Sequence, residues 1–287
     1  MSTELMLAVT VVLAPFNVLK QPHPKVLLES AITRLPDILS YAVSIGLIDA
    51  LSKKCMKIRE PIEAHQSVVL SVLACLGLLT KFTDVCPKNS SSSKLLSVVK
   101  STELFGTISL LYATIVPVGE KIPPRTVSVA ASAFNLILTI ANLDLDVFQS
   151  IMGQESLLLQ YLDVVTILLK YCGPKTNENR ETQAVIVDLV ATLGFLCANN
   201  KQNQNRFISD QSSVILKSLS KLPKSFDIVV YPTLLCLTCD NDGAKNVIGK
   251  EFDLKLIEDY EKSDSGKKNK MLMLLHSNSK ENNKSNK

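Results

Sequence analysis

The chain has 287 residues, of which 46% are hydrophobic and 20% charged, and its formal net charge is +4. This composition excludes disorder for the bulk of the chain, and the length is sufficient for a large core without metals or disulfides. There is no tryptophan and there are only three histidines, so the usual side chains of catalysis are scarce. The seven cysteines are odd in number and scattered, which favours a reducing compartment over a secreted disulfide scaffold.

The apolar pattern is helical throughout the body. Apolar residues recur at spacings of three and four, as in Val68–Leu79 and Val185–Leu196, while the alternation typical of strands is rare. We therefore predict an all-α fold. Breaks between helical blocks are expected where Pro, Gly and Ser gather, at residues 21–24, 86–94, 117–124, 173–181 and 222–225.

The longest apolar runs, Leu5–Phe16 and Val68–Leu79, are about a dozen residues each. A helix that spans a bilayer needs roughly 20, so we expect no transmembrane segment. The first run also lacks the preceding basic residues of a secretory signal. A cytoplasmic location is the expectation.

A weak repeat runs through residues 1–260, with units centred on positions 46, 101, 153, 209 and 249. Three copies open on an Asn/Asp-rich segment, at Asn142, Asn199 and Asn241, and continue through an apolar pair and a small residue into an apolar helix. The pattern predicts an irregular armadillo/HEAT-like α-solenoid of about five units, in which each unit buries the apolar face of its neighbour. A non-repetitive helical bundle is the alternative.

Each repeat has a simple physical interpretation. Asn or Asp before a short helix accepts hydrogen bonds from the N–H groups of the first turn. We expect Gly46, Gly153 and Gly249 to end these short helices in the left-handed conformation and to turn the chain into a longer helix.

The segment 261–287 carries the whole charge excess. It contains seven lysines and three acidic residues and is rich in Asn and Ser, so a disordered tail is predicted. Residues 1–260 are neutral overall and therefore have no general positive field that would attract nucleic acid. Within the tail, Met271–Leu275 is long enough for a short amphipathic helix that binds a partner or a membrane surface, with disorder as the alternative.

Four segments between Ala31 and Glu258 resemble the C-terminal helical region of the S-phase cyclin A-associated proteins of the endoplasmic reticulum. The most specific is the octapeptide Phe148–Glu155. The others are Leu35–Leu51, Thr102–Tyr112, and Leu222–Pro223 together with Tyr231–Leu234.

The resemblance implies a non-enzymatic adaptor at the cytosolic face of the endoplasmic reticulum. Its implied partners are cyclin A, a ribosome-bound tetratricopeptide-repeat specificity factor and a deadenylase complex, in the co-translational decay of tubulin messenger RNA. The helical region is the part implied to dock on the ribosomal assembly. The alternative is a structural scaffold for cyclin A or endoplasmic-reticulum partners that does not contact the ribosome.

Two basic groups are candidate contacts to ribosomal RNA phosphates. They are Lys53, Lys54, Lys57 and Arg59 in one run, and Lys217, Lys221 and Lys224 about one helical turn apart. Such contacts would recognise shape and charge and would weaken with salt. The alternative is structural, because basic side chains are favoured at helix C-termini by the helix dipole.

The remaining candidates for chemistry are weak. Cys236 and Cys239 form a C-x-x-C, but no second close pair exists to complete a zinc site, and packing on one helical face is the alternative. His23 and His65 have no carboxylate and nucleophile nearby in sequence. No phosphate-binding glycine motif is present. We expect no catalytic residue, cofactor or metal.

Overall fold

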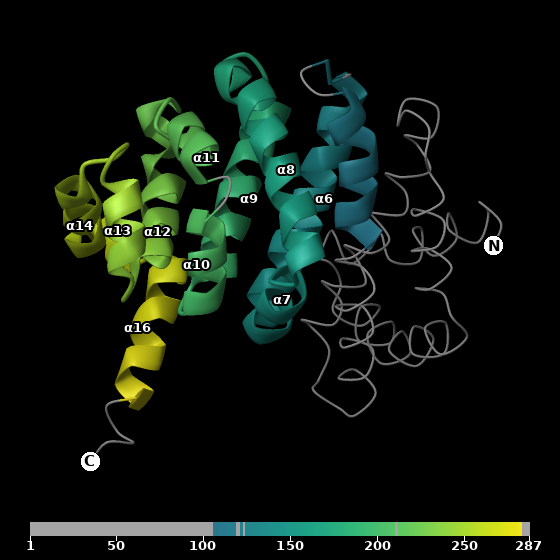
Figure 1. The fold of residues 1–287 in the computed structure, drawn as a ribbon. Coiled ribbons are helices and arrows are strands. Elements are labelled where there is room, and N and C mark those ends of the chain that lie inside the picture. Colours follow the sequence, from purple (N-terminus) through teal and green to yellow (C-terminus); the bar gives the residue numbers. More distant parts are fainter. Residues whose placement is uncertain (1–105, 119–120, 123, 210–211, 283–287) are drawn as a thin grey trace, which may run out of the picture. The chain divides into compact units, whose positions relative to one another are not determined.

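The computed structural model describes residues 106–118, 121–122, 124–209 and 212–282, and every regular element in these ranges is a helix (Figure 1). The all-α prediction is therefore confirmed. The chain forms two compact units, residues 1–147 and 148–287. The boundary falls inside helix α7 (Leu145–Met152).

The described part of the first unit is a helix over residues 106–115, the 3-10 turn η1 (Val116–Val118) and helix α6 (Pro124–Leu143). Proline at the start of α6 has no N–H to leave unpaired, so it suits this position. Apolar side chains at spacings of three and four along α6 are buried, among them Ala130, Phe134 and Ile137.

The second unit is a succession of long and short helices (Figure 1). The elements are α7, α8 (Glu155–Cys172), η2 (Gly173–Lys175), α9 (Arg180–Cys197), α10 (Lys201–Ser209), α11 (Ser212–Leu219), η3 (Lys224–Phe226), α12 (Asp227–Thr238), α13 (Asp242–Ile248), α14 (Leu254–Lys262), α15 (Asp264–Lys267) and α16 (Lys270–Asn282). The breaks predicted at 173–181 and 222–225 are confirmed. The helix predicted over 185–196 lies within α9, with ten of its twelve residues buried.

Two successive triplets of helices have the same order. Helices α9, α10 and α11 are followed by α12, α13 and α14, and α10 and α13 are short helices in the middle position. Equivalent helices touch, since α9 packs on α12 and α10 packs on α13. The α9–α12 contact is the most extensive one among the described helices.

The predicted Asn/Asp caps are present at all three described copies. The side chains of Asp144, Asn200 and Asn241 each accept a hydrogen bond from the backbone N–H three residues later, at 3.0 to 3.1 Å. The first N–H groups of a helix have no acceptor within the helix itself. These side-chain bonds provide one, and so define where α7, α10 and α13 begin.

A buried glutamine joins each of the short helices α7 and α10 to the helices that follow it. Gln149 on α7 donates from Nε2 to the carbonyl oxygens of Phe195 and Ala198, both at 2.7 Å, and its Oε1 accepts from Asn200 at 3.1 Å. The amide thus pairs two carbonyls at the C-terminal end of α9, which lack partners within their own helix. We refer to this arrangement as a glutamine clasp.

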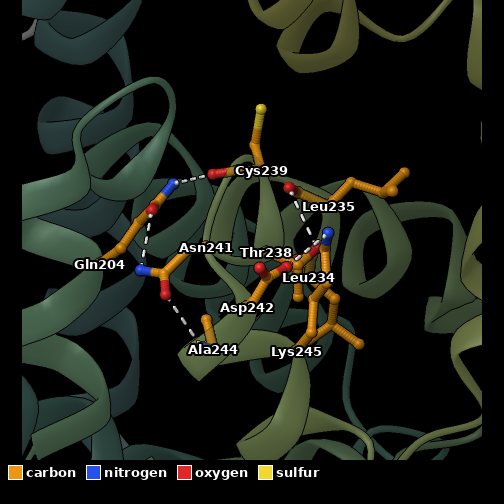
Figure 2. Close-up of polar contacts among 9 residues, drawn as sticks. All are labelled: Gln204, Leu234, Leu235, Thr238, Cys239, Asn241, Asp242, Ala244 and Lys245. Atoms are coloured by element: carbon orange, nitrogen blue, oxygen red, sulfur yellow. Dashed lines mark hydrogen bonds and ion pairs between the residues drawn. The ribbon is translucent and has the colours of Figure 1, made fainter.

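The same clasp occurs a second time, at Gln204 on α10 (Figure 2). Its Nε2 lies 2.8 Å from the carbonyl oxygen of Cys236 and 3.3 Å from that of Cys239, and its Oε1 accepts from Asn241 at 3.2 Å. Three of the four partners of Gln204 lie 41 positions after the three partners of Gln149; the fourth is the carbonyl oxygen of Cys197, at 3.2 Å from Nε2.

The left-handed residues are not the glycines that we predicted. Gly249 has φ −63°, in the right-handed region, and Gly153 is not left-handed either. Among the described non-glycine residues, the left-handed positions are Asn199 (φ 54°) and Asp240 (φ 52°), each directly before a capping Asn. Asn and Asp tolerate this conformation better than other non-glycine residues, so the sharp turn precedes the short helix and does not follow it. Gly46 lies outside the described residues.

Gly153 is required for a different reason. A Cβ atom at this position would overlap the side chain of Asn203 and lie 2.7 Å from the carbonyl oxygen of Gln149. The Asn203 amide in turn donates to that carbonyl at 3.3 Å and to the carbonyl of Leu196 at 3.0 Å. Gly153 therefore leaves space for the polar network beside the first clasp.

The segment that we predicted to be a disordered tail is helical over most of its length. Helix α16 buries Met271, Leu272 and Leu275, and it packs against α12. The high lysine content of the segment does not indicate this helix. Three apolar side chains on one face are enough to stabilise a helix that can pack against a core.

Candidate functional site

The second basic group lies at the junction of α11 and η3. Lys217 is in the last turn of α11, Lys221 is in the turn that follows, and Lys224 begins η3. All three side chains are exposed, and no carboxylate of the described residues forms an ion pair with them. Phosphate contact by this group stays a prediction. The first group, Lys53, Lys54, Lys57 and Arg59, lies outside the described residues.

The Cys236/Cys239 pair belongs to the end of α12. Cys236 is buried in the helix, and Cys239 is half-buried at its C-cap. Burial raises the pKa of both thiols; nearby Asp240 and Glu261 raise the pKa of Cys239 further. A redox or nucleophilic cysteine needs the opposite, a lowered pKa that favours the thiolate. The structure therefore supports the packing interpretation of this C-x-x-C.

The other described cysteines are buried as well. Burial raises the pKa of the Cys172 thiol to about 12, and it raises the pKa of Cys197. The phenol of Tyr161, whose pKa is likewise raised by burial, donates to or accepts from the hydroxyl of Thr192 at 2.9 Å. These groups are held protonated inside the core and serve packing.

A cavity of about 330 Å³ lies beside Cys239. It is lined by the end of α12 and by residues of α13, α14 and α16, with Lys245, Glu258, Glu261 and His276 among its charged or titratable side chains. The imidazole Nε2 of His276 lies 3.4 Å from a carboxylate oxygen of Glu261. In Figure 2 the Cys239 sulfur points away from Gln204, whereas the Cys239 carbonyl faces it.

The chemistry of this cavity is mixed. Its lining carries acidic and basic side chains together, so it selects neither for a cation nor for an anion. Among residues 106–118, 121–122, 124–209 and 212–282, no three or more His, Cys, Asp and Glu side chains are placed to hold a metal ion. His23 and His65 lie outside these ranges. His276, which sequence reasoning placed in a disordered tail, reaches the cavity because α16 folds back.

A second hollow, of about 270 Å³, lies between α8 and α10. Leu158, Leu159 and Leu162 line one side and Arg206 the other. The Arg206 guanidinium donates to the carbonyl oxygen of Gly153 and so is committed to the turn between α7 and α8. Leu159 is 41% exposed at this edge.

Two helices are long and apolar enough to cross a membrane by length and composition alone, in residues 125–143 and 155–175. Neither helix is an uninterrupted apolar run, since each contains scattered polar residues, so the sequence pattern did not predict them as spans. About half of each window is buried inside the protein, as in the core helices of soluble proteins, so these are weak indications of a span.

Comparison with known proteins identifies one relative. The chain is 22% identical to the human S phase cyclin A-associated protein in the endoplasmic reticulum, in an alignment of 255 residues that covers 79% of the chain. The chain spans 18% of that relative's length. No protein-family model matches the chain. The similarity confirms the resemblance that was found in the four sequence segments.

Proposed function

We propose that the chain is a non-enzymatic helical adaptor module, built as an irregular armadillo/HEAT-like α-solenoid. The observation that carries this proposal is the repeated glutamine clasp. The same side-chain type, on equivalent short helices, pairs equivalent carbonyls 41 positions apart. In a stacked array each unit is stabilised by its neighbour. A hydrogen bond that recurs between successive groups of helices fits such an array.

The state of the titratable groups supports a role without catalysis. The buried thiols and the buried phenol are held in their neutral forms. Active sites more often contain groups whose pKa values are shifted toward the working pH. For these buried groups of the described residues, the pKa values are shifted away from the working pH.

The proposed partners are ribosome-associated complexes in co-translational messenger RNA decay, at the cytosolic face of the endoplasmic reticulum. This part rests on the family resemblance, and on the exposed group Lys217, Lys221 and Lys224 as a contact for ribosomal RNA phosphates. Exposed lysines that have no described acidic partner are available to phosphate, and each such contact releases counterions and makes binding salt-dependent.

Co-sedimentation with purified ribosomes tests the proposal. We expect the bound fraction to fall as salt rises from 50 to 200 mM, and the variant Lys217→Glu/Lys221→Glu/Lys224→Glu to bind at least about tenfold more weakly. The matched control reverses three other exposed lysines, Lys201, Lys250 and Lys255, and should bind like the natural chain. Equal binding by both triple variants would contradict the phosphate-contact model.

The alternative partner is cyclin A, because the human relative carries cyclin A association in its name. In this case the chain is a scaffold that does not contact ribosomes. Affinity purification with and without RNase separates the two functions. Recovery of cyclin A from RNase-treated extract, together with failure to sediment with ribosomes at low salt, would favour the alternative.

A further inference from the structure

Ser220 directly follows α11, at the start of the turn that leads to η3. Its backbone N–H donates to the carbonyl oxygen of Leu216 at 2.9 Å, so the chain still follows the helical path at this residue. The side chain is exposed, and its hydroxyl donates to the carbonyl oxygen of Lys217 at 3.1 Å. Water can replace an exposed hydrogen bond of this kind at little cost, so the hydroxyl is accessible to an enzyme in solution.

The charged residues near Ser220 in the sequence are all lysines. Lys217 precedes it by three positions, Lys221 follows it directly, and Lys224 stands at the fourth position after it. All three lysine side chains are exposed. Because residues three apart on a helix are neighbours, Lys217 and Ser220 share one face at the end of α11.

This environment distinguishes Ser220 from the other exposed serines of the described residues. Three lysines and no carboxylate lie within four positions of Ser220, whereas Ser265 has Asp264 beside it and Ser225 has Asp227 two positions later. The remaining exposed serines in the described ranges have at most one lysine or arginine within four positions. A kinase that selects basic segments by acidic side chains of its own therefore has one preferred serine here.

The backbone hydrogen bonds of the turn after Ser220 are local. The Lys221 N–H donates to the carbonyl oxygen of Ser218 at 3.3 Å, and the Leu222 N–H donates to that of Leu219 at 3.1 Å. Residues 220–223 belong to no helix. A turn of this kind opens at a much lower cost than the whole fold does, so the segment can adapt to the substrate groove of a kinase.

We propose that Ser220 is a phosphorylation site for a basic-directed serine kinase, and that its phosphorylation abolishes phosphate binding by Lys217, Lys221 and Lys224. In the transfer the Ser220 oxygen attacks the γ-phosphorus of ATP bound to the kinase. An O–P bond forms, the bond between the γ-phosphorus and the bridging oxygen of ADP breaks, and the serine proton passes to a carboxylate of the kinase. The second part rests on the proposed function, because it regulates the same lysines.

The added charge is large enough to act on the whole lysine group. A phosphoserine carries about −1.5 to −2 charges at neutral pH, and it stands among three lysines. Its three oxygens accept hydrogen bonds from ammonium groups that otherwise bind a nucleic-acid phosphate. The dipole of α11 opposes a negative charge at its C-terminal end, so the lysines are also what stabilises the phosphate at this position.

Incubation of the folded full chain with ATP and the catalytic domain of protein kinase C tests the site. Peptide mass mapping should find phosphate on Ser220, and none on Ser213, an exposed serine of α11 with no basic residue within three positions. Lys217→Ala should slow the reaction at Ser220 at least about tenfold, since charge complementarity steers the encounter. The control Lys201→Ala removes a distant exposed lysine and should leave the rate unchanged. Absence of phosphate on Ser220 of the folded chain would overturn the proposal.

Binding of a labelled RNA hairpin, measured by fluorescence anisotropy, tests the consequence without ribosomes. The phosphorylated chain and the variant Ser220→Glu should bind the hairpin at least about tenfold more weakly than the natural chain, and with a shallower dependence on salt. Ser220→Ala should bind like the natural chain, and circular dichroism checks that each variant is folded. Equal affinity of the phosphorylated and unmodified chains would overturn the regulatory part.

The outcomes separate this proposal from the proposed function. If phosphorylation weakens hairpin binding but the natural chain does not sediment with ribosomes, the site stands and the ribosomal function fails. If sedimentation with ribosomes is lost in the triple lysine variant but unchanged by phosphorylation of Ser220, the ribosomal function stands and the regulation proposed for Ser220 is wrong.

Discussion

The hydroxyl of Tyr260 on α14 donates to the carbonyl oxygen of Ile228 on α12 at 3.3 Å. This carbonyl is the one that Pro232, four residues further along α12, leaves without its helical partner, because proline has no N–H. Tyr260 also meets the ring of Tyr231 edge-on, with centroids 5.7 Å apart. A side chain of the next helix thus supplies the donor that the sequence of α12 lacks.

Tyr260→Phe keeps the ring contact and removes the hydroxyl, which donates to the Ile228 carbonyl and also makes a hydrogen bond with the Asn269 side chain. We expect a loss of about 1 kcal/mol in the free energy of unfolding, the usual net value of one hydrogen bond. Chemical denaturation measures it. In a Pro232→Ala background α12 regains an N–H, so the same substitution should cost clearly less; an unchanged cost in that background would contradict this role of Tyr260.

The glutamine clasps are expected to dominate polar stability in the second unit. Gln149→Ala and Gln204→Ala each leave buried carbonyls of the following helix end without a donor, and each should cost about 2 to 4 kcal/mol. Thermal unfolding monitored by circular dichroism measures the loss.

Gln160 is the matched control for the clasps. Its side-chain oxygen is buried with no hydrogen-bond partner among the described residues. Gln160→Met removes this buried oxygen, which makes no hydrogen bond there, so stability should stay the same or rise. A loss at Gln160 as large as that at the clasps would contradict the assignment of the clasp effect to hydrogen bonding.

Local features of the fold were predictable from the sequence because they depend on neighbours in the chain. The Asn/Asp caps and the α9 face follow from residues within one or two turns. The clasps were not predictable, since Gln149 and its acceptors on α9 are 46 and 49 positions apart. The local pattern is compatible with an amphipathic helix at Met271–Leu275 but does not show where it packs, because the burial of Met271 depends on a recess at Gly194. The unequal repeat spacing has a local cause. Helix α8, which follows the short helix α7, has 18 residues, whereas α11, which follows the short helix α10, has 8.

Two glycines should respond in opposite ways to alanine. Gly153→Ala places a methyl group against Asn203 and the Gln149 carbonyl, and we expect a loss of about 1 to 3 kcal/mol. Gly243 lies in α13, where a Cβ would make only ordinary contacts at 3.4 and 3.7 Å. Gly243→Ala should therefore stabilise the chain by about 0.5 to 1 kcal/mol. Urea unfolding of both variants checks the signs, and destabilisation by Gly243→Ala would contradict this account.

Alkaline pH should destabilise the fold through its buried thiols. Burial raises the pKa of Cys172 from its ordinary value of 9.0 to about 12, so the folded chain keeps a proton that the unfolded chain loses. The contribution to stability is complete below pH 9 and is lost as the pH rises toward 12. Urea midpoints at pH 7.5, 9 and 10.5 should fall in that order. The fall should be shallower in Cys172→Ala, and an identical slope in that variant would exclude Cys172 as a cause.

Thiol modification distinguishes the packing role of the C-x-x-C from a chemical one. Cys236 is fully buried and Cys239 is half-buried beside the cavity, and the pKa of each is raised by burial. A thiol reagent needs both access and thiolate, so at pH 7.5 the native chain should label Cys239 slowly and Cys236 only on unfolding. Peptide mass mapping after timed labelling gives both rates. If the pair were a redox dithiol, one cysteine would react within seconds in the native chain, and mild oxidation would join the two. We expect neither, because the Cys236 thiol faces the core and the carbonyls of both residues are held by Gln204.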